Sequence, residues 1–139
     1  MSKYNAKKIE YKGHVFDSKV ECEYYQHLES KMNGVNYDRI EIQPRYELVP
    51  KFGKQRKAEY IADFALYLND ELIEVIDVKG RPTETAKLKA KIFRYLYRDV
   101  KLTWICKAPK YTDQEWITYE ELIKVRKKRK KEKMENGKD

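Results

Sequence analysis

The chain has 139 residues with a formal net charge of +8, and 41% of its residues are hydrophobic and 39% charged. That length fits one compact domain, no apolar run approaches the roughly 20 residues that cross a bilayer, and the N-terminal residues contain no apolar signal region. The two cysteines, Cys22 and Cys106, make neither a disulfide framework nor a CxxC zinc pair, so we expect a soluble, cytoplasmic protein that does not associate with membranes.

The first part of the chain is predicted to contain one helix. Residues 1–13 are polar and end in a glycine, which indicates an arm or a short strand pair. An apolar residue recurs every four positions over residues 18–32, and this spacing predicts a helix. Ser18 is typical of its start and Asn33-Gly34 of its end. The apolar stripe of this helix comprises Val20, Tyr24, Leu28 and Met32.

The middle of the chain is predicted to form strands. Apolar residues occupy even positions within residues 37–49, where Pro44 interrupts the pattern. Residues 50–57 then form a basic loop. Two β-rich runs follow, over residues 60–68 and 72–78, and the polar residues between them predict a hairpin.

The last part is predicted to alternate between helix and strand. Residues 84–98 have helical spacing, residues 101–106 form a short strand, and residues 115–133 form a final helix whose last part consists mainly of charged residues. The order of elements predicts an α/β fold in which helices flank a mixed central sheet of about four strands. We expect one domain over residues 1–123 and a basic helix end or tail over residues 124–139. The buried face of the helix over 84–98 is predicted to comprise Leu88, Ile92, Tyr95 and Leu96.

Much of the positive charge lies in that tail. Residues 124–139 hold nine of the 31 Lys and Arg residues and three of the 23 acidic ones, a local net charge of +6, and residues 1–123 carry the remaining +2. The tail therefore favours a polyanionic partner such as DNA, which it would grip without sequence preference. The alternative is a disordered, solubilising end.

Three charged residues interrupt the apolar strands of the predicted hairpin, Asp63 in the first strand and Asp77 and Lys79 in the second. A charge in a buried strand is costly unless it is paired or bound to a metal. If the loop has three residues, Asp63 faces Asp77 on one face of the sheet at about 5 Å, with Lys79 two residues along. A two-residue loop would instead set Asp63 against Ile76 and separate the acids.

Two carboxylates at so short a distance repel each other unless a cation lies between them. Mg²⁺ prefers oxygen ligands and binds through one or two carboxylates plus substrate phosphate, and Mn²⁺ can substitute. Such an ion can polarise a phosphoryl oxygen and activate water, while the lysine stabilises charge that builds on the phosphorus. The alternative is a plain salt bridge between Lys79 and Asp63 or Asp77 in an exposed edge strand.

These residues resemble the motif of the PD-(D/E)XK nuclease superfamily, which includes restriction enzymes and several Holliday-junction resolvases. Ala62-Asp63 resembles the "PD" element, with alanine in place of proline, and Asp77-Val78-Lys79 resembles the (D/E)-x-K element. Thirteen residues separate the two acids, a common hairpin spacing in the family. The resemblance covers about residues 12–106 and implies a restriction-endonuclease-like αβββαβ core.

The resemblance also implies roles for individual residues. Asp63, Asp77 and Lys79 would be catalytic, together with a glutamate on the first core helix, for which Glu21 fits. The implied metal ligands are Glu21, Asp63, Asp77 and Val78.

Two of the polar residues near this motif have alternative explanations. Ser18-x-x-Glu21 is a capping box, in which the Glu21 side chain reaches back to the Ser18 backbone N–H, and Glu23 is then the fallback. Gln43 matches a polar residue that some members of the superfamily place near the metal, but an exposed strand position explains it as well.

The stretches over residues 16–25, 42–44 and 60–64 resemble a small phage and prophage branch of the superfamily. The resemblance implies a Mg²⁺-dependent DNA endonuclease, in a bacterial host cytoplasm if it is phage-encoded, with branched or recombination-intermediate DNA as the expected substrate. Junction cutting needs two active sites, so a homodimer is expected in that case. The alternative is a non-catalytic nucleic-acid-binding module that retains the nuclease fold.

Basic residues in two further places are candidates for contact with DNA, and an ordinary solvated surface is the alternative for both. The helix over residues 84–98 carries a basic stripe at helical spacing, formed by Lys87, Lys91, Arg94 and Arg98. The loop over residues 50–57 carries Lys51, Lys54, Arg56 and Lys57. No base-reading motif is visible, so sequence-specific cutting is not predicted.

Overall fold

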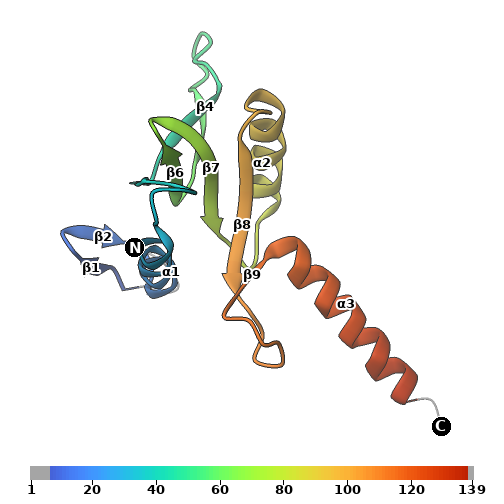
Figure 1. The fold of residues 1–139 in the computed structure, drawn as a ribbon. Helices are drawn as coiled ribbons and strands as arrows, with labels where there is room; N and C mark the ends of the chain where they lie inside the picture. Colours follow the sequence, from blue (N-terminus) through green and yellow to red (C-terminus); the bar gives the residue numbers. More distant parts are fainter. Residues whose placement is uncertain (1–6, 138–139) are drawn as a thin grey trace.

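The computed structural model describes residues 7–137 of the chain (Figure 1). Within this range the three helices are α1 (Lys19–Lys31), α2 (Glu84–Leu96) and α3 (Tyr119–Asn136). The nine strands in the same range are β1 (Ile9–Tyr11), β2 (His14–Phe16), β3 (Arg39–Ile42), β4 (Arg45–Val49), β5 (Ala58–Ile61), β6 (Phe64–Leu68), β7 (Glu71–Val78), β8 (Lys101–Lys107) and β9 (Trp116–Thr118). The α/β class predicted from the sequence is confirmed.

The main sheet has five strands in the order β3-β6-β7-β8-β9, and β1–β2 and β4–β5 form two separate hairpins. β7 and β8 run parallel on either side of the α2 crossover, and the other neighbouring pairs are antiparallel. The sheet is mixed, as predicted, but has one strand more than expected. This strand is β9, which lies wholly within the segment over residues 115–133 predicted to be helical. That helix begins at Tyr119, where Thr118 caps it by accepting a hydrogen bond from the backbone N–H of Glu121 at 3.2 Å.

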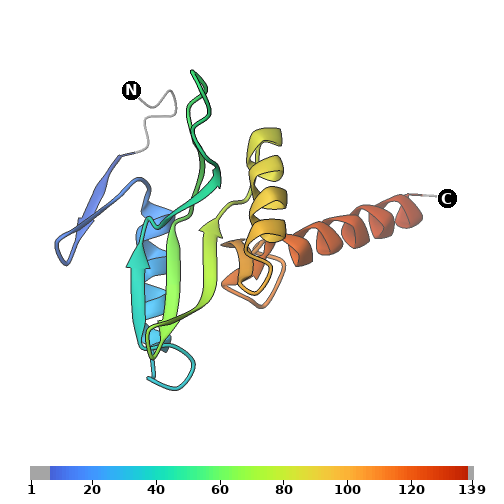
Figure 2. The same ribbon diagram turned by 90° about the horizontal axis from the view of Figure 1, so that it is seen from above.

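The main sheet carries a helix on each face (Figure 2). Side chains alternate along a strand, so neighbouring residues of β6 and β7 belong to different layers. Phe64 and Ile76 pack with α1 in one buried cluster, whereas Val75 packs with Phe93 of α2 in another. The predicted arrangement of helices flanking a central sheet is therefore observed.

The β-rich run predicted over residues 60–68 is two strands, because the chain bends at Ala62 and Asp63. β5 pairs with β4, whereas β6 joins the main sheet. The sequence hides this break, since both segments are rich in apolar residues. β3 and β4 are divided in a similar way at Gln43, which has a φ of 52°, and at Pro44, as the proline predicts.

A two-residue turn joins β6 to β7, and the assumed three-residue loop is wrong. Leu68 pairs with Glu71, so Asn69 and Asp70 alone form the turn, with left-handed φ values of 52° and 65°. Turns of this kind suit hairpins because their twist matches that of the strands. A plain two-residue hairpin, however, would slide the strands by one residue and separate the two acids.

A β-bulge in β7 restores the register that the acids need. The pairing shifts by one residue between Leu66 and Tyr67, and Ile73 of β7 is the extra residue. Beyond the bulge the strands pair as they would with a three-residue loop, so Asp63 lies level with Asp77. The predicted alignment of the acids is therefore present, but it arises from a turn and a bulge together.

The buried face of α2 differs from the predicted one. Ala90 and Phe93 are buried and Ile92 packs partly buried beside them, as predicted for Ile92, whereas Leu88, Tyr95 and Leu96 expose 58%, 68% and 47% of their surface. Phe93 packs against three tyrosine rings whose centroids lie 4.8–5.2 Å away. An aromatic layer, not the Leu and Ile stripe, therefore determines which side of α2 faces the sheet.

The buried face of α1 is only partly the predicted stripe. Tyr24 and Leu28 are buried as expected, but Met32 follows the end of the helix and is exposed. Cys22 and Tyr25 complete the buried face instead. Aromatic packing explains the difference, because Tyr25 stacks on Phe64 with centroids 6.0 Å apart.

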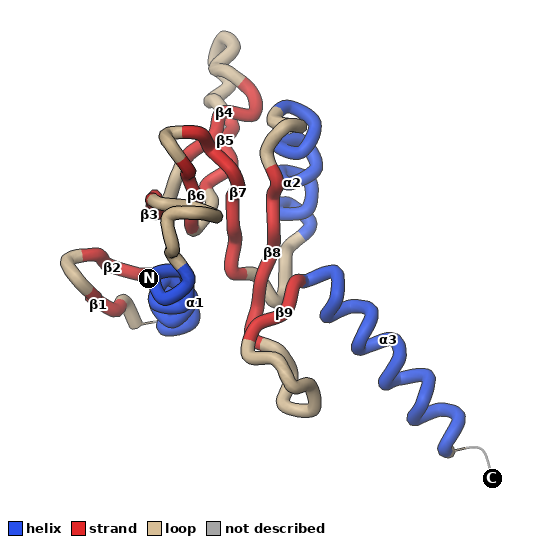
Figure 3. The backbone as a smooth tube through the Cα atoms, viewed as in Figure 1, coloured by secondary structure: helices blue, strands red, loops and turns tan. Residues whose placement is uncertain are grey.

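α3 leaves the body of the molecule as one continuous helix (Figures 1 and 3). Leu122 is its one buried residue in the described part of the chain, and it packs with Cys106 and Ile117. The basic residues from Lys124 to Lys133 are thus helical and continuous with the start of α3. Lys138 of the predicted tail lies outside the described residues. Among residues 7–137, no helix is long and apolar enough to cross a membrane.

Replacing Asp70 tests the turn that joins β6 to β7. Asp70→Gly relieves the left-handed conformation and should raise the free energy of unfolding by about 0.5–1 kcal/mol, whereas Asp70→Val should lower it by about 1–2 kcal/mol. Urea denaturation followed by circular dichroism measures both changes. Equal stability of the two variants would contradict this turn.

Candidate active site

Asp63 and Asp77 lie side by side on the main sheet. Asp63 directly precedes β6, Asp77 is the penultimate residue of β7, and the bulge brings them level. Their neighbours in the chain, Phe64 and Ile76, both pack into the α1 layer. By alternation the two acids therefore belong to the opposite, α2 layer, as the hypothesis of a shared site requires.

Each carboxylate is anchored by the backbone of the other segment. Asp77 Oδ1 accepts a hydrogen bond from the backbone N–H of Asp63 at 3.0 Å, and Asp63 Oδ2 accepts one from the backbone N–H of Val78 at 2.7 Å. The two side chains are therefore fixed relative to each other. Val78, predicted as a metal ligand, orients the Asp63 carboxylate through its backbone N–H.

Tyr60 and Trp104 complete the surroundings of Asp77, and the sequence analysis identifies neither residue. The Tyr60 hydroxyl donates a hydrogen bond to Asp77 Oδ2 and accepts one from Trp104 Nε1 at 3.0 Å. Asp77 and Trp104 are register partners on β7 and β8, and Asp77 exposes only 1% of its surface. The one signal in the sequence is general: a buried tyrosine or tryptophan usually needs a hydrogen-bond partner.

Burial raises the pKa of both acids. The pKa of Asp63 rises to about 8, first because the side chain is buried and then because Asp77 and Glu21 are negatively charged. Burial also raises the pKa of Asp77, while the hydrogen bond from Tyr60 and the charge of Lys79 oppose the rise. Near neutral pH the pair therefore keeps a proton unless a cation takes its place.

Lys79 lies beside the acid pair without an ion pair to either member. Its positive charge acts to lower the pKa of Asp63 and of Asp77, and its backbone N–H donates to the carbonyl oxygen of Ile105 at 2.8 Å. No ion pair joins Lys79 to an acid in the described part of the chain. The alternative of a plain salt bridge within the hairpin is therefore wrong.

Glu21 lies in the first turn of α1, at the start of the helix and near the acid pair. Its backbone N–H donates to Ser18 Oγ at 3.2 Å, which is one half of a capping box. Burial raises the pKa of Glu21, and nearby negative charges that include Asp77 raise it further. Glu21 is thus close enough for the charge of Asp77 to affect its pKa. The fallback residue Glu23 instead forms an ion pair with Lys107 at 2.8 Å.

Gln43 borders the site but does not direct its side chain to the acid pair. Its backbone N–H donates to the carbonyl oxygen of Asp63 at 2.9 Å. Its side-chain amide donates to Asp17 Oδ2 at 3.3 Å. Gln43 therefore helps to hold the bend at Asp63.

Asp63 and Asp77 fit a magnesium ion as a pair. Within residues 7–137 no three acidic, histidine or cysteine side chains converge into a ready-made metal site, so Glu21 does not join the pair in one cluster. Mg²⁺ needs only one or two carboxylates, because it keeps several waters and also binds substrate phosphates. Two neighbouring buried carboxylates also favour a cation between them. Of the four predicted ligands, the structure brings these two carboxylates together, and the metal-binding roles of Glu21 and Val78 stay predictions.

The predicted DNA-contacting residues occupy two separate regions. One is the exposed surface of α2, with Lys87, Lys91 and Arg94, together with Arg98 just after the helix ends. The other is the exposed loop at the far tip of the β4–β5 hairpin (Figure 1), with Lys51, Lys54, Arg56 and Lys57. Six extended residues span about 20 Å, so the loop is distant from Asp63. α2 is the nearer region, because it starts five residues after Lys79.

A comparison with known protein families matches residues 1–113 to the family described as "Protein of unknown function (DUF1064)". The chain belongs to the DUF1064 family. The DUF1064 region contains both acids of the pair, Glu21 and Lys79, and it ends before β9 and α3. No curated protein and no solved structure matches the chain. The resemblance to PD-(D/E)XK nucleases stays a prediction.

The raised pKa of Asp63 predicts how the stability of this DUF1064 protein depends on pH. The pKa of about 8 exceeds the ordinary value of 3.8, so the folded state binds more protons than the unfolded state between these values. The free energy of unfolding should therefore decrease as the pH rises from about 4 to about 8, because the folded state loses the proton on Asp63. In EDTA, Asp63→Asn should melt about 5 °C or more above the wild type at pH 8 and close to it at pH 4.

Differential scanning calorimetry measures this difference in Tm. Asp113→Asn, which makes the same change at an exposed position, should show no pH-dependent gain. Added Mg²⁺ should stabilise the wild type most at high pH, where the acids are ionised. A constant difference between Asp63→Asn and wild type at every pH would contradict the assigned pKa.

Proposed function

We propose that the protein is a magnesium-dependent DNA endonuclease with a restriction-endonuclease-like core, in which Mn²⁺ can replace Mg²⁺. One observation carries the proposal. The carboxylates of Asp63 and Asp77 are both buried and lie level with each other on neighbouring segments, and Lys79 follows Asp77 by two residues. Such an arrangement destabilises the fold, because each acid is denied water and lies near a like charge. A structural role does not require this arrangement, whereas a metal-dependent hydrolase does.

Each residue of the site has a distinct part in the proposed reaction. Asp63 and Asp77 would hold Mg²⁺, and the backbone N–H of Val78 keeps the Asp63 carboxylate oriented. When bound, Mg²⁺ supplies Lewis-acid chemistry at the scissile phosphate. Lys79 would orient the attacking water and stabilise the negative charge that builds on the phosphate. Glu21, with its raised pKa, is suited to accept a proton from that water.

The basic surface of α2 supports DNA as the substrate. Three exposed cations lie on this helix and Arg98 lies just after its end, and the helix packs against the same face of the sheet as the acid pair. A DNA backbone that follows α2 would therefore pass close to Asp77 and Lys79. Branched or recombination-intermediate DNA remains the expected substrate, with a homodimer if junctions are cut on two strands.

A nucleic-acid-binding module without catalysis is the second candidate. It is favoured by the finding that no three-ligand metal cluster occurs among residues 7–137. It leaves the burial of Asp63 and Asp77 unexplained, however. The nuclease therefore accounts for more of the observed arrangement.

Substitution of Asp77 and Lys79 tests the nuclease. With Mg²⁺ or Mn²⁺, the wild type should nick supercoiled and branched DNA, and EDTA should abolish cutting. Asp77→Asn and Lys79→Ala should each slow cutting by roughly 100-fold or more, because one removes a metal ligand and the other removes charge stabilisation of the transition state. Gel electrophoresis of labelled DNA measures the rates.

Matched controls separate this effect from loss of charge or fold. Asp113→Asn and Lys110→Ala change the same residue types at exposed positions between β8 and β9, and they should cut at the wild-type rate. Circular dichroism confirms that all four variants fold. If the folded wild type binds DNA with either metal but cuts none of the substrates, the binding module is the function instead.

Neutral substitutions in α3 test whether this helix grips DNA. Lys127, Lys128 and Lys131 are exposed on the part of α3 that leaves the domain. Replacing all three with Gln should weaken binding to any DNA sequence, and should reduce the slope of log affinity against log salt by roughly 0.9 for each phosphate that the helix no longer neutralises. Fluorescence anisotropy at several salt concentrations measures the slope. An unchanged slope would argue that α3 lies away from the DNA.

A further inference from the structure

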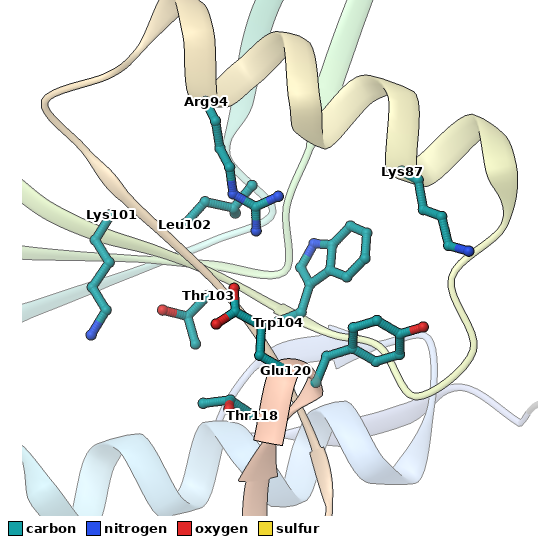
Figure 4. Close-up of a pocket in the computed structure, with 9 residues that line it drawn as sticks. Lys87, Arg94, Lys101, Leu102, Thr103, Trp104, Thr118 and Glu120 are labelled. Carbon is teal, nitrogen blue, oxygen red and sulfur yellow. The ribbon is translucent and has the colours of Figure 1, made fainter. Parts of the chain in front are cut away.

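A cavity of about 350 Å³ lies between α2, β8 and the start of α3 (Figure 4). The cavity is lined by residues 101–104 of β8, by Lys87 and Arg94 of α2, and by Thr118, Tyr119 and Glu120. Neither Asp63 nor Asp77 is part of this lining. The cavity is therefore distinct from the candidate active site.

Aromatic rings and cations meet in this cavity. The rings of Trp104 and Tyr119 pack edge to face with centroids 5.6 Å apart. Arg94 reaches from α2 toward the Trp104 ring, and its guanidinium lies 5.7 Å from the ring centre. Lys87 lines the cavity from another turn of α2, with its side chain directed away from that ring (Figure 4). Glu120 lies on the opposite wall (Figure 4). The cavity thus combines flat apolar surface with positive charge and one acidic hydrogen-bond acceptor.

The cations of the cavity are available to an anionic ligand. Arg94 forms no ion pair with any residue in the described range. Lys87 pairs with an exposed glutamate at 3.3 Å, and Lys101 pairs with Glu74 at 3.8 Å. The Lys87 pair is exposed and contributes little, so a phosphate can replace its glutamate at small cost. The guanidinium of Arg94 is also well suited to bind phosphate oxygens in a forked geometry.

These features match a single nucleotide. Nucleobases stack on aromatic side chains while their phosphates pair with Arg and Lys. A volume of about 350 Å³ is at the lower end for ligand sites, so it admits one nucleotide but no base pair. Glu120 can accept a hydrogen bond from an exocyclic amine of the base.

The floor of the cavity is connected to the acid pair. Trp104 donates a hydrogen bond to Tyr60, and Tyr60 donates one to Asp77. Trp104 and Asp77 are also register partners on adjacent strands, which lie about 4.8 Å apart. A nucleotide in the cavity would therefore bring the neighbouring part of its strand to the candidate active site.

We propose that the cavity holds one unpaired nucleotide of a DNA strand, with its base against Trp104 and Tyr119 and its phosphate on Arg94 and Lys87. This inference rests on the proposed function, because it names the substrates that the nuclease selects. These are DNAs with a bulged, flipped or single-stranded nucleotide beside the scissile bond. A fully paired duplex does not fill the cavity.

Binding of the full chain to two labelled duplexes in EDTA tests the proposal. One duplex carries a single bulged nucleotide, and the other is the same sequence fully paired. Fluorescence anisotropy should show that the wild type binds the bulged duplex about tenfold more tightly, since stacking of one base is worth that much. Tyr119→Leu and Arg94→Gln should each remove most of this preference.

The same residue types on α2 or just after its end provide the controls. Tyr95→Leu alters an exposed tyrosine of α2 outside the cavity and should keep the preference. Arg98→Gln should weaken binding to both duplexes alike and leave their ratio unchanged, because Arg98 does not line the cavity. Arg94 is exposed, so Arg94→Gln remains informative if Tyr119→Leu does not fold.

Two results would overturn the proposal: equal affinity of the wild type for both duplexes, or a preference that survives in Arg94→Gln. Because EDTA prevents cutting, the outcome is independent of catalysis. A bulge preference in a protein that cuts nothing keeps the nucleotide site and removes the nuclease. Cutting without a bulge preference does the opposite.

Discussion

Two carboxylates held in a buried layer between the sheet and α2 are the constraint on which the rest of the site depends. The fold limits their cost by satisfying them locally: each accepts a backbone N–H from the other segment, and Tyr60 donates to Asp77. These bonds fix the oxygens but do not neutralise them, which is why burial still raises the pKa of both acids. Lys79 is near enough to reduce the pKa of the pair but is not bonded to it. The two carboxylates are thus held in place by hydrogen bonds, but their negative charge is not neutralised. A divalent cation that binds between them would supply the missing positive charge.

The register of one hairpin decides whether this arrangement exists. Side chains alternate with a period of two residues, so a slip of one residue would turn one acid to the other face of the sheet. The tight turn at Asn69 and Asp70 introduces such a slip, and the bulge at Ile73 removes it. The turn without the bulge, or the bulge without the turn, would leave Asp63 and Asp77 out of register. Bulges often occur beside functional residues because they re-aim a side chain, and this one acts from four residues before Asp77.

The sequence predicts the elements of this fold better than their contacts. Spacing and caps locate α1, α2 and the β6–β7 hairpin to within a few residues, and the isolated charges at Asp63 and Asp77 identify the acid pair. Turn length and the bulge could not be predicted, because a two-residue turn with a bulge and a three-residue loop leave the same apolar pattern. Strand β9 is three residues long and precedes a strongly helical segment, so its pattern is too short to detect. Tyr60 and Trp104 meet only through the fold, 44 residues apart in the chain.

The orientation of α2 connects the acid pair to the cavity behind it. The sequence offers two apolar faces on this helix, and the one chosen from Leu88 and Ile92 lies roughly half a turn from the face that Ala90 and Phe93 bury. Had α2 buried the Leu and Ile face, Arg94 and Lys87 would point away from the sheet. Because Phe93 packs into the tyrosine layer instead, both cations line the cavity, and Arg94 reaches the Trp104 ring. The same aromatic packing that supports Asp77 through Tyr60 therefore also forms the wall of a separate, positively charged cavity.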